Sequence, residues 1–251
     1  MAKRAIGIDI GGTGIKGALV DVKNGKLLSE RIRFETPVGG TPKDIASTLQ
    51  QLIDQIPNSQ GLPVGICFPA VVKNGVTMSA ANVSKEWIKL DADKLFEREL
   101  KRTVHVLNDA DAAGLSEAKY GAAKDVDGLV IVTTLGTGIG TALIYRGKLI
   151  PNSELGHLEI DGVDYESKAA FSAKEREGLS WDQWAERLEI YFSKLEALLT
   201  PDLFIVGGGV SKEHEEFLPL IQIQTPIVPA KNRNSAGILG AAYWAKKHTV
   251  D

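Results

Sequence analysis

A repeated glycine-rich pattern constrains the fold of this 251-residue chain more than any other feature of its sequence. Residues 12–19 read GTGIKGAL, and residues 136–143 read GTGIGTAL. Each copy follows an apolar run, at residues 5–10 and 129–134, and each is followed further along by Gly-Lys-Leu. A near-match in the same context indicates a duplicated unit. We therefore predict two copies of a strand, a glycine turn and a returning strand.

The glycine turns are suited to binding phosphate. Glycine has no Cβ and tolerates positive φ, so the backbone N–H groups of such a turn can approach a ligand closely and form an anion-binding nest. Lys16 adds a positive charge, and Asp9 is placed to hold Mg²⁺ directly or through water. A tight hairpin that merely requires glycine is the alternative. The expected phosphate-binding residues are Gly11, Gly12, Thr13, Gly14, Lys16, Gly136, Thr137 and Gly138.

Composition and charge restrict the classes of function. Hydrophobic residues make up 43% of the chain and charged residues 24%, which is typical of a soluble globular protein. The net charge of -3 disfavours a general nucleic-acid-binding protein. The one cysteine, Cys67, has no disulfide partner within the chain, which favours a reducing cytoplasm. We expect no membrane segment and no signal peptide before the first strand.

The predicted elements follow one order twice. Three strands, a helix, a strand, a helix, a strand and a helix are expected, and the pattern restarts at residue 129. Thr41 and Pro42 indicate a helix start, because a hydroxyl cap and a proline in the first turn are typical of helix N-termini. Ser180, with Gln183 as its capping partner, indicates the start of a long helix.

Five motifs, in this order along the chain, resemble those of the actin/hexokinase superfamily and of its ROK group (repressors, unknown reading frames and sugar kinases). Residues 9–13 (DIGGT) resemble the first phosphate motif, and residues 135–140 (LGTGIG) resemble the second. Asn108-Asp109 and residues 154–157 (ELGH) are similar to the sugar-site motifs of the ROK group. Residues 206–210 (VGGGV) resemble the nucleotide-side motif. The resemblance covers almost the whole chain.

The resemblance implies an α/β, two-lobed actin/hexokinase-like (ribonuclease-H-like) fold with a duplicated βββαβα unit and a central cleft. It places a small N-terminal lobe at residues 1–108 plus 236–251 and a larger C-terminal lobe at residues 109–235. In such a fold the two glycine turns would hold a phosphate chain from both sides of the cleft.

The implied activity is phosphoryl transfer to the 6-hydroxyl of glucose or a similar hexose such as mannose, with Mg²⁺ as the cofactor. Residues 14–18 and 201–205 are similar to those of group members that use inorganic polyphosphate. Polyphosphate and ATP are therefore the expected donors, and a strictly ATP-dependent ROK sugar kinase is the alternative. A cytoplasmic homodimer that binds neither nucleic acid nor membrane is expected.

The resemblance also implies roles for individual residues. Asp109 is the expected general base for the sugar hydroxyl, and a cap on the following helix is its alternative role. For His157 the competing role is structural, and for Glu166 it is that of a solvated surface acid. Lys231 and Arg233 could equally be ordinary solvated charges. The expected sugar-binding residues are Asn82, Asn108, Asp109, Glu154, His157 and Glu166, the nucleotide-side residues are Gly207, Gly208 and Gly209, and the polyphosphate track is Lys231 and Arg233.

Some features depart from the ROK pattern or favour other classes of protein. Many ROK kinases carry a cysteine-rich zinc loop after the ELGH motif, and this chain has no cysteine there, so no structural zinc is expected. The spacing from Asn82 to Trp87 is longer than usual. A repressor of the group needs a helix-turn-helix before the first phosphate motif, and Asp9 leaves no room for one. A nucleotide switch without a sugar is disfavoured by the sugar-site motifs.

Overall fold

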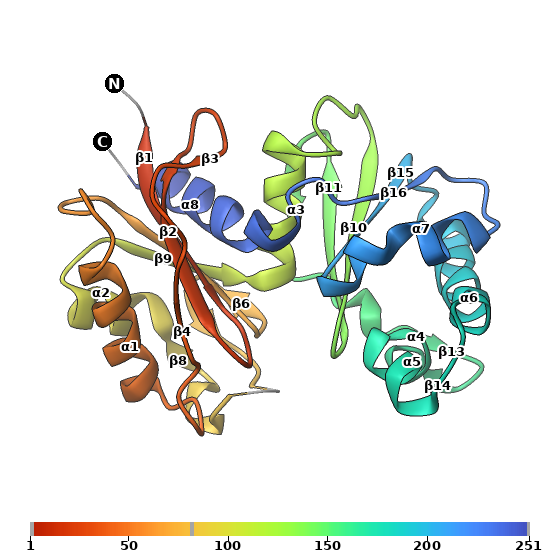
Figure 1. The fold of residues 1–251 in the computed structure, drawn as a ribbon, viewed down its shortest axis with the longest axis horizontal. Helices are drawn as coiled ribbons and strands as arrows, with labels where there is room; N and C mark the ends of the chain where they lie inside the picture. The colour runs from red at the N-terminus through yellow and green to blue at the C-terminus, as the bar shows by residue number, and fades with distance from the viewer. Residues whose placement is uncertain (1–2, 81–82, 250–251) are drawn as a thin grey trace. The chain divides into compact units, whose positions relative to one another are not determined.

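The computed structural model describes residues 3–80 and 83–249, which form two compact units (Figure 1). Unit 1 comprises Met1–Ser116 and Ser235–Asp251, and unit 2 comprises Glu117–Asn234. The C-terminal segment therefore returns to the unit in which the chain began. The lobe boundaries expected from the sequence, after residues 108 and 235, remain a prediction.

The main sheet of unit 1 is built around the hairpin that contains the first glycine turn. Its strands are β1 (Arg4–Ile10), β2 (Ile15–Asp21), β3 (Lys26–Leu27), β4 (Ile32–Phe34), β5 (Val64–Phe68) and β9 (Val104–Asn108). Their order is β3-β2-β1-β5-β9, and β4 also pairs with β2. β1 runs antiparallel to β2 but parallel to β5, and β5 runs parallel to β9. The carboxyl ends of β1, β5 and β9 therefore meet at one edge of the sheet.

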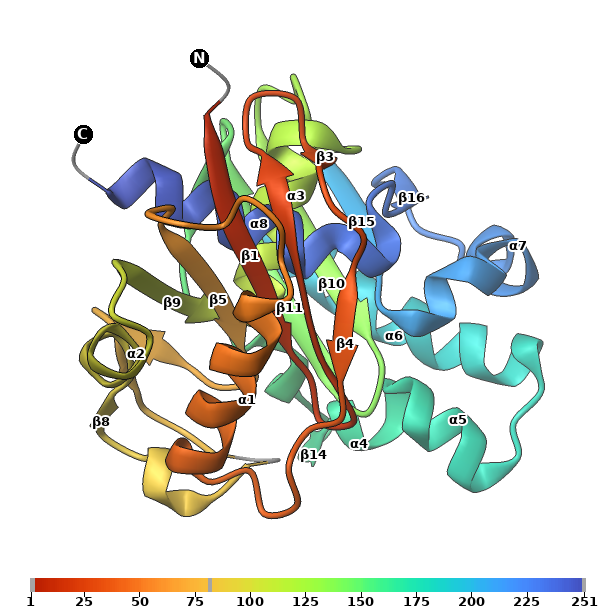
Figure 2. The same cartoon turned by 60° about the vertical axis from the view of Figure 1, so that its left-hand side comes forward.

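Helices cover both faces of this sheet. They are α1 (Pro42–Asp54), α2 (Ala92–Leu100) and α8 (Ala236–His248). The helix α3 (Asp109–Tyr120) follows β9 directly, and its Ala112 lies against Gly240 of α8. Figure 2 shows α1 and α2 on one face of the sheet and α8 on the other. A side chain at Gly7 or Gly65 would overlap the backbone carbonyl of Ile238 or Ala241, so these glycines allow α8 to pack directly against β1 and β5. Thr41 accepts a hydrogen bond from the Asp44 N–H, which confirms the predicted start of α1.

Short elements complete unit 1. A small sheet has the order β6-β7-β8, and a 3₁₀ turn precedes its last strand. The elements are β6 (Val72–Lys73), β7 (Val76–Thr77), η1 (Lys85–Trp87) and β8 (Leu90–Asp91). Trp87 is fully buried and packs against Phe68 and Phe96, which anchors this segment to the core.

The sheet of unit 2 repeats the topology of unit 1. Its strands are β10 (Leu129–Leu135), β11 (Ile139–Tyr145), β12 (Lys148–Ile150), β15 (Leu203–Gly207) and β16 (Ile227–Pro229). The order β12-β11-β10-β15-β16 again places an antiparallel hairpin beside two parallel strands. The duplicated strand arrangement that the repeated glycine pattern predicted is confirmed.

The helices of unit 2 pack mainly on one core. α6 (Trp181–Leu199) begins with the predicted capping box, in which Ser180 and Gln183 each bond to the backbone of the other. It buries Trp184, Leu188 and Phe192.

No helix in residues 3–80 and 83–249 is long and apolar enough to span a bilayer. The remaining elements are η2 (Leu155–His157), β13 (Glu159–Ile160), β14 (Val163–Asp164), α4 (Glu166–Ala169), α5 (Phe171–Glu177), η3 (Gly209–Glu213), α7 (His214–Phe217), η4 (Leu218–Leu220) and η5 (Arg233–Ser235).

Candidate active site

The two glycine turns are closed by different backbone hydrogen bonds, but each has a glycine with open space beside it. In the first, the Gly11 N–H donates to the Gly14 carbonyl at 3.0 Å, and in the second, the Gly136 N–H donates to the Gly138 carbonyl at 3.0 Å. A Cβ placed on Gly12 or on the corresponding Gly136 would have no atom within 4 Å, and neither residue has positive φ. Neither packing nor backbone conformation within the protein therefore requires glycine at these positions. Glycine at these positions is explained if a ligand must approach the backbone N–H groups closely.

A basic residue that the sequence reasoning missed lies beside the first turn. Arg33 on β4 is the register partner of Lys16 on β2, and its Nη2 donates to the Thr13 carbonyl at 3.3 Å. A Cβ on Gly14 would lie 2.9 Å from Arg33 Nε, so the glycine leaves room for the guanidinium. Only the pairing of β4 with β2 brings Arg33 here, and no local motif marks it.

Asp9 lies half-buried near the carboxyl end of β1, next to Cys67 on β5. The Cys67 thiol donates to Asp9 Oδ1 at 3.4 Å. Burial raises the pKa of Cys67, and the nearby carboxylates of Asp9 and Asp109 raise it further. The two carboxylates thus lie near one another at the same edge of the sheet. Carboxylate oxygens suit Mg²⁺, which is usually held by one or two of them together with substrate phosphates and water.

The protein residues do not form a complete metal cage. In the described part of the chain, no group of three or more histidine, cysteine, aspartate or glutamate side chains could hold a metal ion. The role of Asp9 in holding Mg²⁺ remains a prediction.

Asn108 and Asp109 lie where β9 ends and α3 begins. Asn108 is buried, its Nδ2 donates to the Ala70 carbonyl at 3.1 Å, and its Oδ1 accepts from the Asp111 N–H at 3.1 Å. Asn108 therefore accepts a hydrogen bond from the N–H group three residues further along the chain, as is typical of a helix N-cap. Asp109 is exposed, and its Oδ1 accepts from the adjacent Ala110 N–H at 2.8 Å. Asn108 thus fills the capping role that was the alternative for Asp109, and the general-base role of Asp109 remains a prediction.

Glu166 supports the second glycine turn. Its Oε2 accepts from the Ile139 N–H at 2.7 Å, and a Cβ on Gly138 would lie 2.5 Å from the same oxygen. On the other side of the turn, Ser172 Oγ donates to the Thr137 carbonyl at 2.6 Å. Glu166 is therefore not a freely solvated acid. Its predicted contact with sugar remains a prediction.

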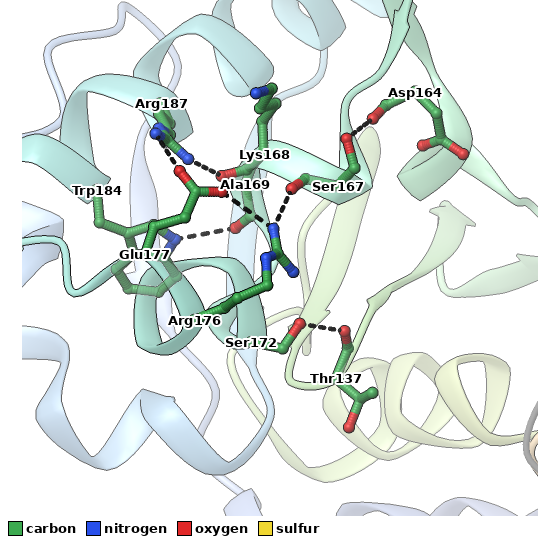
Figure 3. Close-up of polar contacts among 10 residues, drawn as sticks. All are labelled: Thr137, Asp164, Ser167, Lys168, Ala169, Ser172, Arg176, Glu177, Trp184 and Arg187. Atoms are coloured by element: carbon green, nitrogen blue, oxygen red, sulfur yellow. Dashed lines mark hydrogen bonds and ion pairs between the residues drawn. The ribbon is translucent and has the colours of Figure 1, made fainter.

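A polar network fixes the helix that carries Glu166 (Figure 3). Arg187 donates to Glu177 at 2.7 Å and to the Lys168 carbonyl at 3.1 Å, and Arg176 donates to the Ser167 carbonyl at 2.9 Å. Hydrogen bonds from Arg187 and Arg176 lower the pKa of Glu177 to about 2, so its carboxylate stays charged at neutral pH. The network ties α4 to α5 and α6 and so holds Glu166 against the turn.

His157 and Glu154 share an acidic environment near Glu166. Asp164 Oδ2 bonds His157 Nδ1 at 2.9 Å, and Asp164 Oδ1 accepts from the Glu166 N–H at 3.1 Å. The hydrogen bond to Asp164 raises the pKa of His157, and the carboxylates of Glu166, Asp164 and Glu154 raise it further. Desolvation raises the pKa of Glu154, while His157 opposes that shift. Asp164 is a residue that the sequence motifs do not mark, because its pairing with His157 arises from the hairpin of β13 and β14.

The nucleotide-side glycines lie next to the second turn. Gly208 has φ +85°, and a Cβ there would overlap the backbone of Leu135, the residue before Gly136. A Cβ on Gly209 would have no atom within 4 Å, as at Gly12 and Gly136. The predicted motif therefore presents open backbone close to the second glycine turn, within unit 2.

A buried carboxylate holds the segment that contains the expected polyphosphate track. Glu117 is fully buried and accepts from the N–H groups of Ala122 at 2.7 Å, Lys231 at 3.2 Å and Asn232 at 2.8 Å. The side chains of Lys231 and Arg233 are exposed. Their role as a track remains a prediction. The remaining predicted sugar residue, Asn82, lies outside the described residues.

Comparison with known proteins identifies the family. The sequence model described as "ROK family" matches residues 5–178. A polyphosphate glucokinase of Mycobacterium tuberculosis is 45% identical over 241 residues, which are 96% of this chain and 90% of that protein. The crystal structure of an inorganic polyphosphate/ATP-glucomannokinase from Arthrobacter sp. strain KM is 53% identical, with a TM-score of 0.93, over 98% of this chain and 99% of that one.

A more distant structure shares the fold. The ROK family glucokinase from Streptomyces griseus, in complex with glucose and AMPPNP, has a TM-score of 0.82 at 24% identity, over 97% of this chain and 99% of that one. The actin/hexokinase-like α/β fold expected from the sequence is thus confirmed. With its duplicated sheet, its paired glycine turns and its match to the family model over residues 5–178, the chain belongs to the ROK family.

Proposed function

We propose that this chain is a glucokinase that transfers a phosphoryl group from inorganic polyphosphate or ATP to the 6-hydroxyl of glucose. The observation that carries the proposal is the pair of open turns at Gly12 and Gly136, where packing within the protein does not account for glycine and an approaching ligand would. The relatives with 45% and 53% identity are named for polyphosphate-dependent phosphorylation of glucose or of glucose and mannose.

The donor side of the reaction uses backbone N–H groups and positive charge. Phosphoryl transfer passes through a loose transition state that needs alignment and charge neutralisation. The N–H groups of both glycine turns would bind phosphate oxygens, and Lys16 would add a charge. Asp9 would hold Mg²⁺, which neutralises phosphate oxygens when bound.

The acceptor side uses the polar residues near Asp109 and in the ELGH motif. Asp109 would accept the proton of the attacking hydroxyl, and general-base help of this kind contributes roughly 10²–10⁴-fold. Asn108 fixes the start of α3 and so the position of Asp109. Glu154, His157 and Glu166 would bind sugar hydroxyls. Because Asp164 bonds His157 Nδ1, the nitrogen that would bind a hydroxyl is His157 Nε2. A homodimer and a cytoplasmic location remain predictions.

The first experiment measures glucose phosphorylation with Mg²⁺ and either ATP or polyphosphate at low salt. Phosphorylation with both donors is expected. Activity with ATP and none with polyphosphate would instead mean a strictly ATP-dependent ROK glucokinase. Absence of activity with either donor would refute the proposal.

The second experiment tests the base. Asp109→Asn should retain the fold and glucose binding but lower kcat by roughly 10²-fold or more. Asp127→Asn is the matched control, because Asp127 forms an exposed ion pair with Arg146. It should leave kcat unchanged. Near-normal kcat in folded Asp109→Asn would remove this residue from the mechanism.

A further inference from the structure

The corresponding positions of the two glycine turns face side chains of opposite charge. Gly14 in unit 1 lies against the guanidinium of Arg33, whereas Gly138 in unit 2 lies against the carboxylate of Glu166. The duplicated turns therefore differ in the charge beside them, although their sequences are nearly the same. The guanidinium at the first turn attracts additional phosphates more strongly than the second turn does, where a carboxylate lies.

Arg33 extends a row of charged residues across neighbouring strands of unit 1. Asp9 on β1 pairs with Lys16 on β2, and Lys16 pairs with Arg33 on β4. Register partners point to the same face of a sheet, and neighbouring strands lie roughly 4.8 Å apart. The row therefore presents a carboxylate, an ammonium and a guanidinium in succession. It leads away from the residue that would hold Mg²⁺.

In the described residues neither cation of the row forms an ion pair, although Asp9 is the register partner of Lys16. Ion pairs within residues 3–80 and 83–249 involve other lysines and arginines, and none includes Lys16 or Arg33. Arg33 is exposed, and its hydrogen bond to the Thr13 carbonyl holds it at the turn through a single nitrogen. A guanidinium has five N–H donors in a planar fork that suits phosphate oxygens.

We propose that Lys16 and Arg33 bind the phosphates that follow the transferred group, and that Arg33 selects inorganic polyphosphate over ATP. This inference rests on the proposed kinase function. In ATP the phosphates end at a ribose and a base, which gain nothing from a further cation. In a polyphosphate each unit carries charge, so a second cation on the next strand favours the longer polyanion.

The test compares Arg33→Gln with the wild type for long-chain polyphosphate and ATP as donors. Arg33→Gln should raise KM for long-chain polyphosphate about 10-fold, as expected for one charge-assisted contact. KM for ATP should change less than about 2-fold on the same scale, and kcat should stay unchanged. In Arg33→Gln, the slope of log KM for polyphosphate against log salt concentration should be smaller than in the wild type by about one, by analogy with counterion release from nucleic acids.

Two further variants make the result specific. Arg33→Lys retains the charge but not the fork, and its KM for polyphosphate should lie between those of the wild type and Arg33→Gln. Lys26→Gln removes an exposed charge on β3, where Lys26 is the register partner of Asp21 at the end of β2 remote from the turn. Its KM for polyphosphate should equal that of the wild type. Direct binding of polyphosphate in the absence of glucose should follow the same order.

The possible outcomes are separable. A wild-type protein that does not use polyphosphate refutes the donor assignment itself. A second outcome is a wild type that uses polyphosphate and an Arg33→Gln variant with the same KM for polyphosphate. If the double variant Lys231→Gln, Arg233→Gln then has a raised KM for polyphosphate, the polyphosphate follows the track in unit 2 and the inference is wrong. An equal rise in KM for ATP and polyphosphate in Arg33→Gln would also overturn it, because Arg33 would then bind both donors alike.

Discussion

Replacing Glu117 should destabilise unit 2 more than replacing any exposed acid does. This residue is fully buried near the end of α3 and accepts three backbone N–H bonds, from Ala122, Lys231 and Asn232. A Cβ on Gly121 would clash with its Oε2, so the chain leaves little space for another arrangement or for water. The carboxylate therefore joins the end of α3 to the segment after β16.

The expected cost follows from the lost acceptors. A buried donor left without a partner costs about 1–3 kcal/mol. Glu117→Ala leaves three backbone N–H groups without their acceptor and should reduce the free energy of unfolding by about 3–5 kcal/mol. This is the lower end of the additive range, because the space left by the shortened side chain admits some water to these donors. Glu117→Gln keeps one oxygen but turns an NH₂ group toward a backbone N–H. It should cost about 1–3 kcal/mol.

Urea unfolding and amide hydrogen exchange would measure these effects. The amides of Ala122 and Asn232 should exchange faster in both variants. Glu186→Ala is the matched control, since Glu186 lies exposed on α6, and it should change stability by less than about 0.5 kcal/mol. A Glu117→Ala protein within about 1 kcal/mol of the wild type, with unchanged exchange at Ala122, would refute the reasoning.

Two further predictions concern other carboxylates. Asp164→Ala should lower the pKa of His157, because it removes the hydrogen bond that raises this pKa. It should also raise KM for glucose about 10-fold, because the His157 ring loses its fixed orientation. An unchanged titration of the His157 imidazole by NMR would contradict the prediction. Burial raises the pKa of Asp93 to about 6, with Glu97 and Asp91 adding to the shift and the Val106 N–H opposing it. The folded state therefore holds this proton more tightly, and the associated stabilisation is complete below pH 3.8 and is lost as pH rises through about 6. The free energy of unfolding of Asp93→Asn, relative to that of the wild type, should therefore rise by on the order of 2–3 kcal/mol between pH 4 and 7. If urea unfolding gives the same difference between the two proteins at every pH in this range, the prediction is wrong.

Features that depend on residues close in sequence were predictable. The cap at Thr41 and the capping box of Ser180 and Gln183 lie where the sequence indicated, because each involves backbone groups within one helical turn. The duplicated glycine pattern likewise predicted two hairpins, since a turn is closed by the residues that flank it. Glycine occupies positions 12 and 136, where the structure shows open space and no packing reason for it, and phosphate binding at these positions remains a prediction.

The side chains around those turns could not be predicted in the same way. Arg33 reaches the first turn through the pairing of β4 with β2, and Glu166 reaches the second from α4. Asp164 meets His157 through a short hairpin, and Glu117 meets residue 231 across more than a hundred residues of chain. The sequence by itself determined the turns, the caps and the family, because these depend on local spacing. Only the tertiary structure decided the charge beside each turn, because strand register and helix packing bring together residues whose separation along the chain carries no signal.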